Sequence, residues 1–313
     1  MTVPVFTIVT PCLNRAGLIA EAVESVLAQR EVAVEHIVAD GGSTDGTLEV
    51  LARYPHLRVI TGPDQGLYDA INRALAIARG PVIGHLNSDD VLLPGALAAV
   101  ARALEAEPDA DAACGGALVM ATAGPGDPAR ELCRYGNPEM KRLRPVDLCR
   151  GVPMINARFF RRRLYDRVGV YDPSYRYAGD REFLLRAWVA GMRTVPVEET
   201  VYGYRQHADS LTIVGGMNHT VPWLDEHLRL ARRWIGNPAA PPPLQHEARS
   251  WHALEVGRAV VRALGGRRMG DAVRLALDGG ATDPIWPARF FAQTAGYGIH
   301  RLVRGKGVSC WSS

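Results

Sequence analysis

Two adjacent carboxylates, Asp89 and Asp90, follow the short apolar segment 82–86, separated from it only by Asn87 and Ser88. This segment is typical of a buried strand, and neighbouring carboxylates at its end repel each other and lose hydration. A divalent cation relieves that repulsion most simply, because Mg²⁺ and Mn²⁺ take carboxylate oxygens together with substrate phosphates and water. Taken alone, the pair could equally cap the turn before a helix that begins near residue 94.

A second polar strand end is the stretch VADGGSTDGT. Its strand ends in Asp40, whose carboxylate can accept hydrogen bonds from a base or a ribose, and Gly42 lets the backbone approach a flat ligand closely. The alternative is an Asx-type turn with a helix cap at Thr44 or Asp45. The G-x-G-x-x-G spacing of a dinucleotide fingerprint is missing here, which disfavours a dehydrogenase.

These residues need a framework of strands and helices to bring them together. Short β-branched or apolar runs predict strands over 5–10, 34–40, 57–62 and 81–87. Amphipathic runs predict helices over 18–29, 44–54, 66–80 and 94–108. This alternation implies βαβ units and a parallel sheet, in which ligands bind beyond the carboxyl ends of the strands. The four strand ends TPCLNR, DGGSTDGT, TGPDQG and NSDD would then form one site.

The remainder of the chain is less regular. A polar residue, Asn72, lies on the helix stripe that faces the sheet and needs a partner, which the strand-end loops could supply. Pro-rich residues 237–245 predict a boundary between a main domain, 1–236 (halves 1–110 and 111–236), and a helical extension, 237–313. Other predictions are a loop at 121–132, a strand and two helices within 154–191, a strand pair at 193–212, and helices at 246–264 and 269–278.

Composition excludes several classes of protein. The 313 residues are 47% hydrophobic and 22% charged, an ordinary globular balance, and the net charge of +3 gives no support for nucleic-acid binding. Five scattered cysteines without a C-x-x-C pair argue against a disulfide framework or a zinc site and fit a reducing compartment. With neither a signal-peptide pattern nor about 20 consecutive apolar residues, we expect a cytoplasmic protein, at most peripheral at the inner face of the membrane.

Four segments together resemble the family 2 glycosyltransferases, which are inverting enzymes with the GT-A fold. The segments occur in family order over roughly residues 5–212: TIVTPCLNRAGLIAEAVESVLAQ, VADGGSTDGT, DQGLYDAINRALAIARGPVIGHLNSDD and FFRRRLYDRVGVYDPSYRYAGDREFLLR. The resemblance implies an α/β fold, with a GT-A-type nucleotide-binding domain, a mainly parallel central sheet flanked by helices, and a helical C-terminal appendage. It also implies sugar transfer from a nucleotide-diphospho-sugar, with a UDP-sugar favoured, to an acceptor hydroxyl in polysaccharide, glycoconjugate or natural-product biosynthesis.

The resemblance also assigns roles to single residues. The nucleotide-sugar site would comprise Pro11, Leu13, Asn14, Asp40, Gly42, Asp64, Gly66, Asn72, Asn87, Ser88 and Arg205. A Mn²⁺ or Mg²⁺ ion would be bound by Asp89 with Asp90 as its support, and His207 would bind the metal or the diphosphate. For His207 and Arg205 an ordinary structural position is the equal alternative. The D-x-D metal motif of the family begins here with Asn87, which removes one negative charge and weakens the expected metal affinity.

The same resemblance places the catalytic base in AGDREFLLR. Asp180 matches the base, and Gly179 stands where the family has a second acid. A carboxylate at the start of a helix can be oriented by backbone N–H groups and can take a proton from an acceptor hydroxyl about 3 Å away. That hydroxyl would attack the anomeric carbon from the face opposite the leaving group. Glu182 is the alternative base, and a helix N-cap is the alternative role for Asp180.

Two other functions remain open, as does a contact with membranes. A sugar-nucleotide nucleotidyltransferase would need a basic Gly-rich loop, which TPCLNRAG is not; a decayed, glycosyltransferase-like binding module has only Asn87 and Gly179 in its favour. The C-terminal segment mixes aromatic with basic residues, which suits an anionic membrane surface and a lipid-linked acceptor, although these aromatics could instead pack on the main domain. The residues are Trp286, Phe290, Phe291, Tyr297 and Trp311, with Arg289, Arg301, Arg304 and Lys306. The acceptor could be a glycan, a lipid-linked molecule or a small molecule.

Overall fold

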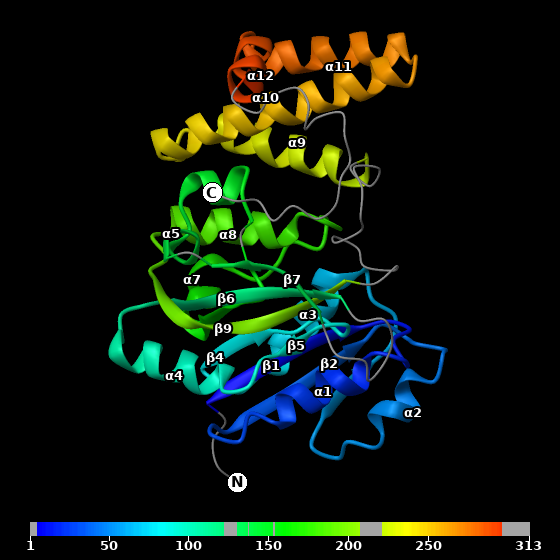
Figure 1. Ribbon diagram of the computed structural model, residues 1–313, viewed down its shortest axis with the longest axis vertical. Coiled ribbons are helices and arrows are strands. Elements are labelled where there is room, and N and C mark those ends of the chain that lie inside the picture. Colours follow the sequence, from blue (N-terminus) through cyan, green and yellow to red (C-terminus); the bar gives the residue numbers. More distant parts are fainter. Residues whose placement is uncertain (1–4, 122–129, 137, 153, 207–220, 296–313) are drawn as a thin grey trace. The chain divides into compact units, whose positions relative to one another are not determined.

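The computed structural model describes residues 5–121, 130–136, 138–152, 154–206 and 221–295. The chain divides into two compact units. Unit 1 comprises Met1–Leu143, Pro153–Val214 and Ser309–Ser313, and unit 2 comprises Arg144–Val152 and Gly215–Val308. Unit 1 is built of strands and helices, whereas the described part of unit 2 is helical (Figure 1).

A mixed sheet forms the centre of unit 1. Its order in the described residues is β3-β2-β1-β4-β8-β6-β9-β5, with β7 paired to β6. The strands are β1 (Phe6–Cys12), β2 (Val34–Asp40), β3 (Arg58–Thr61), β4 (Val82–His85), β5 (Val91–Leu92), β6 (Ala112–Ala121), β7 (Arg130–Tyr135), β8 (Arg158–Arg161) and β9 (Thr194–Gln206). Strands β3, β2, β1 and β4 are parallel, while β8 and β7 run antiparallel to their neighbours. The expected α/β fold class is confirmed, and its continuous parallel part is the N-terminal half.

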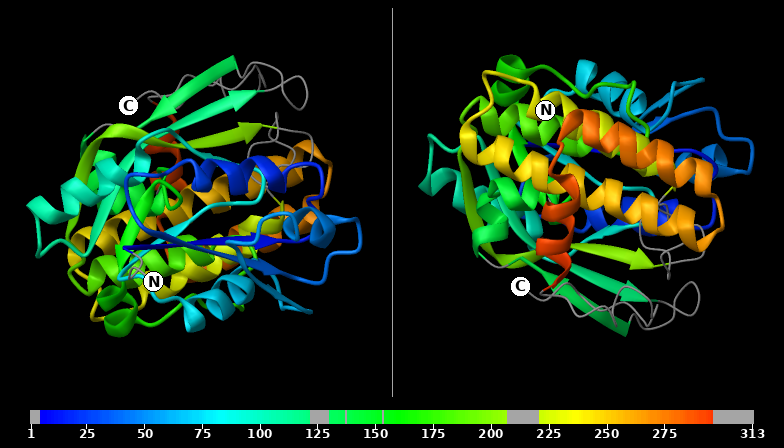
Figure 2. Two further views of the ribbon diagram at one scale, coloured as in Figure 1. Left: turned by 90° about the horizontal axis from the view of Figure 1, so that it is seen from below. Right: turned by 90° about the horizontal axis from the view of Figure 1, so that it is seen from above.

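The helices of unit 1 lie around this sheet (Figure 1). They are α1 (Ile19–Leu27), α2 (Thr47–Leu51), α3 (Leu67–Ile77), α4 (Ala96–Ala106), α5 (Pro138–Arg142), α7 (Arg162–Val168) and α8 (Gly179–Val189). Helix α1 shows why: its residues at i, i+3, i+4 and i+7, beginning with Ile19, are buried. Right-handed crossovers put α1 and α2 on one face of the parallel strands and α3 on the other, as Figure 2 shows.

The C-terminal strand of unit 1 differs from the prediction. Residues 193–212 were expected to contain a strand pair, but the described part forms the single strand β9. Pro196 lies opposite Cys114 and Thr200 opposite Gly116, so β9 has two more residues than β6 at this point. The extra residues form a bulge instead of a turn. The loop predicted at 121–132 is bordered by β6 and β7, and its residues 122–129 lie outside the described residues.

Unit 2 has its own hydrophobic core. Its helices are α6 (Pro145–Cys149), α9 (Val221–Ile235), α10 (Pro242–Gly265), α11 (Met269–Thr282) and α12 (Trp286–Ala295). The buried core cluster comprises Leu228, Ala253, Val256, Trp286 and Phe290. A Cβ added at Gly257 would overlap the ring of Phe290, which shows that α10 and α12 approach closely at this point. The helical unit thus contains α6 and α9 in addition to the helices beyond residue 237.

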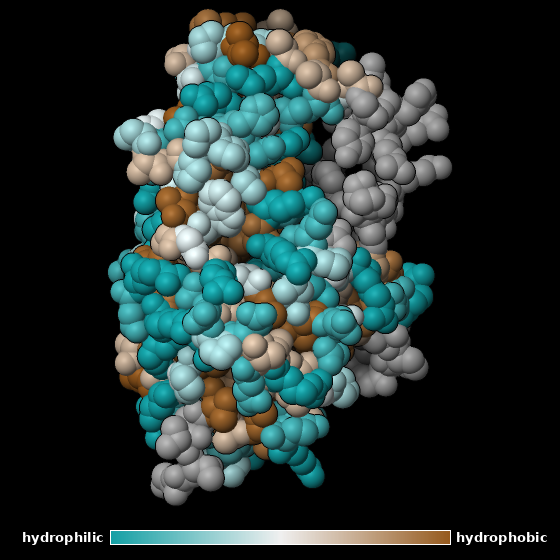
Figure 3. All heavy atoms as spheres, turned by 90° about the vertical axis from the view of Figure 1, so that its left-hand side faces the viewer, coloured by the Kyte–Doolittle hydropathy of each residue, from teal (hydrophilic) through white to brown (hydrophobic). Residues whose placement is uncertain are grey.

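The aromatic residues of the C-terminal segment divide between core and surface. Trp286 and Phe290 are buried in unit 2 and are therefore unavailable to a membrane, whereas Phe291 is 67% exposed. Tyr297 and Trp311 lie outside the described residues. Among the helices that the structure describes, none combines the length and apolarity needed to span a bilayer. On the face drawn in Figure 3, hydrophobic residues are scattered among hydrophilic ones.

Candidate active site

The loop after β1 is clasped to the loop after β2. Asn14 has a left-handed backbone (φ 52°), which asparagine tolerates well. Its backbone N–H donates to Ser43 Oγ (2.7 Å), and its side-chain oxygen accepts from the Thr44 N–H (2.9 Å). Pro11 is buried in β1, whereas Leu13 is 52% exposed. The clasp therefore builds a defined edge at the carboxyl ends of β1 and β2, with an apolar side chain open to a ligand.

Asp40 is the last residue of β2, and only one of its two carboxylate oxygens accepts hydrogen bonds. Oδ2 accepts from the N–H groups of Gly42 and Ser43, both at 3.0 Å, and from Thr61 Oγ1 at 2.9 Å. Burial opposes ionisation, but the hydrogen bonds from Ser43, Thr61 and Gly42 outweigh it and lower the pKa of Asp40. Within the described part of the chain, the buried Oδ1 has no hydrogen-bond partner. A donor group of a ligand would satisfy this oxygen.

The neighbouring loop between β3 and α3 closes over these glycines. A Cβ added at Gly41 would lie 2.7 Å from Asp64 Oδ2, so any larger residue there would displace this carboxylate. Asp64 Oδ1 accepts from the Gly66 N–H at 2.9 Å, and Gly66 has a φ of 115° that favours glycine. The predicted nucleotide residues Gly42, Asp64 and Gly66 thus belong to one packed pair of loops.

Asn72 finds its partner in another place than expected. Its side-chain nitrogen donates to the Tyr171 carbonyl (2.7 Å), and its side-chain oxygen accepts from the Tyr171 N–H (3.0 Å). The amide therefore ties α3 to the loop between α7 and α8, instead of to the strand-end loops. Its predicted part in the nucleotide site stays a prediction.

The NSDD stretch is organised by hydrogen bonds to Asp90. Its Oδ2 accepts from Asn87 Nδ2 (2.9 Å) and from the Tyr202 hydroxyl (2.8 Å), and its Oδ1 accepts from the Arg205 N–H (2.8 Å). The Tyr202 hydroxyl in turn accepts from the Asn87 N–H at 3.1 Å. Ser88 is also buried. The NSDD stretch is therefore held in place by strand β9, which lies more than 100 residues later in the sequence.

The two carboxylates of this stretch have different environments. Asp90 is 3% exposed, and burial, followed by the charge of Asp89, raises the pKa of Asp90 to about 7. Its oxygens already accept three hydrogen bonds, which favours a supporting role, while Asp89 is only half-buried. The guanidinium of Arg205, a predicted phosphate contact, forms an ion pair with Glu21 of α1 at 2.5 Å.

The donor set decides how a cation could be held. Across the described residues, no three His, Cys, Asp or Glu side chains come together around a metal position. One carboxylate, Asp89, fits Mg²⁺ or Mn²⁺, because these ions keep waters and bind substrate phosphates together with one or two carboxylates. His207, the other predicted ligand, lies outside the described residues.

The predicted base lies in the first turn of α8. Asp180 is the second residue of this helix, whose N-cap is Ala178, so Asp180 is not the N-cap. Its Oδ1 accepts from the Arg181 N–H at 2.6 Å. Glu182, the alternative base, is 1% exposed and accepts three hydrogen bonds from the Arg186 guanidinium, at 2.8–2.9 Å. This ion pair favours a structural role for Glu182 and leaves Asp180 as the better candidate.

A second tyrosine of β9 lies next to Tyr202. Tyr204 of β9 is half-buried, and desolvation, followed by the charges of Asp90 and Asp180, raises its pKa well above the ordinary value. Its ring also contacts that of Tyr202 (centroids 4.7 Å apart).

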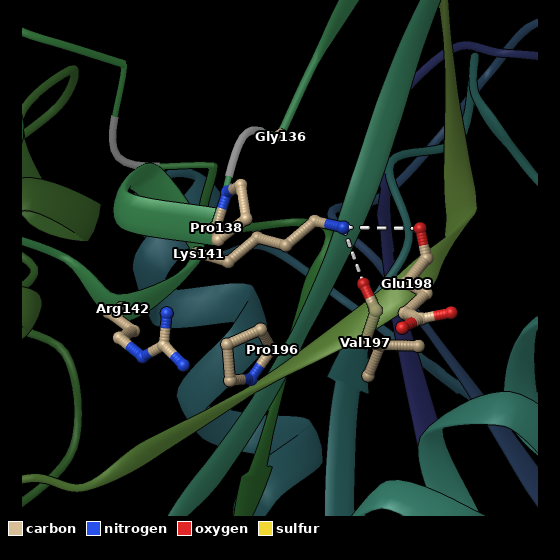
Figure 4. A pocket seen from close by; sticks show the side chains of 7 residues that line it. All are labelled: Gly136, Pro138, Lys141, Arg142, Pro196, Val197 and Glu198. Atoms are coloured by element: carbon tan, nitrogen blue, oxygen red, sulfur yellow. Dashed lines mark hydrogen bonds between the residues drawn. The ribbon is translucent and has the colours of Figure 1, made fainter.

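A separate pocket of about 500 Å³ lies at the other end of β9 (Figure 4). Its lining comprises Gly136, Pro138, Lys141, Arg142, Pro196, Val197 and Glu198. The buried ammonium of Lys141 donates to the carbonyls of Val197 (2.5 Å) and Glu198 (3.2 Å), which the β9 bulge leaves without strand partners. Burial lowers the pKa of Lys141. We infer that Lys141 stabilises the bulge of β9. The candidate active site remains the one at the carboxyl ends of the parallel strands.

Comparison with known proteins identifies the family. A model described as "Glycosyl transferase family 2" matches residues 7–169, more than half of the chain. The chain belongs to glycosyl transferase family 2. The matched range contains the family 2 loops around Asp40 and Asp89 and ends before α8.

Curated relatives of this family 2 chain include a "PGL/p-HBAD biosynthesis glycosyltransferase" of Mycobacterium bovis. It is 31% identical over 194 residues, which cover 60% of this chain and 71% of the relative. The hyaluronan synthase of Pasteurella multocida is 39% identical over 99 residues, covering 30% of this chain and only 10% of the synthase. Glycosyltransferase activity is therefore supported.

Solved structures share the family 2 fold. S. aureus TarS 1-349 has a TM-score of 0.64 at 16% identity, covering 92% of this chain and 84% of that chain. Mannosyltransferase PcManGT from Pyrobaculum calidifontis, in complex with GDP-Man and Mn²⁺, has a TM-score of 0.61 at 18% identity, covering 96% of this chain and 81% of that chain. At these identities the similarity shows the GT-A fold alone.

Proposed function

We propose that this chain is an inverting glycosyltransferase that moves a sugar from a nucleotide-diphospho-sugar to an acceptor hydroxyl, in polysaccharide, glycoconjugate or natural-product biosynthesis. The observation that carries the proposal is that helix α3, which begins at the Asp64–Gly66 loop, packs on the start of α8. The proposed donor loop and the proposed base, Asp180 of α8, thus belong to elements that are in contact. Sugar transfer needs both a site that binds the donor diphosphate and a base that takes the proton of the acceptor hydroxyl. A binding module would need the first but not the second.

The donor is held, in this proposal, at the carboxyl ends of β1–β4. Asp40 Oδ1 accepts from the base or ribose, Leu13 contacts the base, and the Asp64–Gly66 loop closes the nucleotide cleft. Structures similar in fold have been solved with UDP-GlcNAc (TarS) and with GDP-Man and Mn²⁺ (PcManGT), which supports a nucleotide-sugar donor. We favour a UDP-sugar.

The transfer itself is a single displacement. The acceptor oxygen gives its proton to the Asp180 carboxylate as it forms the new bond to the anomeric carbon. The bond from that carbon to the diphosphate oxygen breaks on the opposite face, and the nucleoside diphosphate leaves with the electron pair. When bound at Asp89, with His207 as the proposed further ligand, a divalent cation would offset the charge of the leaving diphosphate. Arg205 is proposed to contact the same phosphates.

Acceptor and location belong to the same proposal. The hydroxyl can belong to a glycan, a lipid-linked molecule or a small molecule, and the relative named "Hyaluronan synthase" supports a glycan. We propose a cytoplasmic reaction, because the four cysteines that the structure describes are free and buried. Contact with the inner membrane face would depend on residues other than Trp286 and Phe290.

The deciding experiment combines donor binding with one substitution. A thermal-shift screen of UDP-, GDP- and dTDP-sugars, with and without Mn²⁺, should show stabilisation by one nucleotide class. With that donor, Asp180→Asn should lower kcat for transfer or for donor hydrolysis by about 100-fold or more, while donor affinity is retained. Parental turnover in the variant would refute the base. Donor binding without any wild-type turnover would instead indicate a binding module.

A further inference from the structure

The helix start that carries Asp180 is packed against one aromatic side chain, Tyr68 of α3. A Cβ added at Gly179 would lie 2.6–2.8 Å from three atoms of the Tyr68 ring, distances that real Cβ atoms do not show. Residue 179 can therefore be only glycine while the ring is in place. The residue joined directly to the proposed base is in this way fitted to a side chain 111 positions earlier in the chain.

The Tyr68 ring is fixed on its other sides as well. It is 5% exposed, its hydroxyl donates to the Tyr177 carbonyl at 3.3 Å, and it stacks on Tyr171 (centroids 5.6 Å apart, planes at 20°). Tyr171 packs in turn on Phe183 of α8, with ring centroids 4.6 Å apart. Its backbone is held to α3 by both polar atoms of Asn72. The ring therefore touches residues on both sides of the turn that leads into α8.

Helix α3 also begins at the donor loop. Its N-cap is Gly66, whose N–H binds Asp64, and Tyr68 is the second residue of the helix. The same turn of α3 thus contacts the proposed nucleotide loop at its N-terminus and the start of α8 through one ring. A rigid packed contact of this kind transmits position better than a hydrogen bond between flexible side chains.

We propose that Tyr68 is a positioning residue for Asp180: by filling the space over Gly179 it fixes the start of α8 and thus the direction in which the Asp180 carboxylate projects. The inference rests on the proposed role of Asp180. It explains why a second acid is not found at position 179, since the aromatic ring occupies the space that any side chain there would need.

The test measures donor hydrolysis or sugar transfer by single-residue variants. Tyr68→Leu removes the ring and should lower kcat about tenfold or more while the KM for the donor changes less than about threefold, because placement of the base is lost but the donor loop remains. Tyr68→Phe keeps the ring and should remain within about threefold of the parent. Tyr165→Leu is the matched control, because Tyr165 is a buried tyrosine of the same aromatic cluster, whereas the three atoms nearest to a Cβ at Gly179 all belong to Tyr68.

A double variant separates positioning from general weakening. Gly179→Ala should also lower kcat, and Gly179→Ala combined with Tyr68→Leu should be no slower than Tyr68→Leu alone, because both changes disrupt one contact. All rates are measured below the unfolding midpoint of each variant. If Tyr68→Leu does not fold, Gly179→Ala with Tyr68 intact decides.

Three results would overturn the inference: a kcat of Tyr68→Leu or Gly179→Ala equal to that of the parent, an equal loss in Tyr165→Leu, or losses that multiply in the double variant. Failure of the proposed function looks different. In that case the parent protein itself shows no turnover with any donor that stabilises it, and the variants have no parental rate to lose.

Discussion

The side-chain amide of Asn87 donates to one oxygen of Asp90, and its backbone N–H donates to the hydroxyl of Tyr202. A carboxylate at position 87 would place a second acceptor 2.9 Å from the Asp90 oxygen, in a site that is almost fully buried. The amide therefore avoids a repulsion that an acid would create. Asn87 fits its surroundings and gives no support for a decayed site.

This contact predicts an order of stabilities. Asn87→Ala should lower the free energy of unfolding by about 1–2 kcal/mol, because one hydrogen bond to a buried carboxyl group is lost. Asn87→Asp should lower it by about 3 kcal/mol, because repulsion is added to that loss. Urea unfolding in EDTA measures both values without metal. An Asn87→Asp variant as stable as the parent would contradict this account of Asn87.

Local motifs identify residues better than they identify partners. Asp40 and Asp89 were predicted as site residues because each follows a strand, and Asp180 because the family resemblance assigns the base to it; these roles stay predictions. Tyr202 could not be located, since it acts on Asp90 from 112 positions away. Tyr68 likewise gives no local signal, because a tyrosine on a helix stripe is typical of any packed helix.

Strand β9 carries a bulge whose carbonyls depend on Lys141 of α5. Lys141→Met should lower the free energy of unfolding by about 2–3 kcal/mol, because the Val197 and Glu198 carbonyls lose a charged donor in a buried place. The control is Arg142→Met, because Arg142 lies on the same short helix but is exposed. This change should alter the free energy of unfolding by less than about 0.5 kcal/mol. Urea midpoints compare the two, and equal effects would argue against the role of Lys141.

Strands β1 and β2 enclose a histidine that should make the protein sensitive to acid. His36 is 2% exposed, its Nε2 lies 2.9 Å from Thr10 Oγ1, and burial lowers its pKa from 6.5 to about 3. Between these values the unfolded chain binds a proton that the folded chain does not. Stability should therefore fall as the pH drops below 6.5, by about 2 kcal/mol from this residue at about pH 5.

Removing the titrating group isolates this contribution. In His36→Leu the loss of unfolding free energy between about pH 7 and about pH 5 should be smaller by that same amount, about 2 kcal/mol. Denaturant unfolding at the two pH values gives the comparison. An unchanged pH dependence in the variant would show that His36 is protonated in the folded protein or is accessible to water.

The regular elements followed from the sequence more closely than the irregular ones. All four predicted N-terminal strands and their helices are present, because hydrophobic periodicity and glycine ends define each of them. Strand β9 was predicted as two strands, because the polar residues of its bulge resemble a turn in the sequence. The lysine that stabilises the bulge lies 56 positions away, so no local pattern indicates it. The stability of such a bulge depends on a partner far away in the sequence, and hydrophobic periodicity contains no information about that partner.

At the scale of the molecule, every described residue of the proposed site belongs to unit 1. Hydrogen exchange should reflect this division when the stabilising nucleotide-sugar is added. At a donor concentration of about ten times Kd, exchange in the loops at 11–16, 40–45, 62–66 and 87–90 should slow by up to about tenfold. Helices α10 and α11 of unit 2 should not change. Equal protection of α10 and α11 would place part of the donor site in the helical unit.

The hydrogen bonds from Tyr202 and Arg205 to Asp90 also constrain the order in which the protein can mature during synthesis. A nascent chain that ends near residue 110 contains β1–β4, both nucleotide loops and Asn87, but it lacks the two partners of Asp90 on β9, which lie 112 and 115 positions further along the chain. Until the ribosome has made β9, Asp90 has to stay hydrated and the NSDD stretch has no fixed form. Pairings over such long separations form slowly. The diphosphate site should therefore be the last part of unit 1 to become competent, which withholds donor binding from incomplete chains.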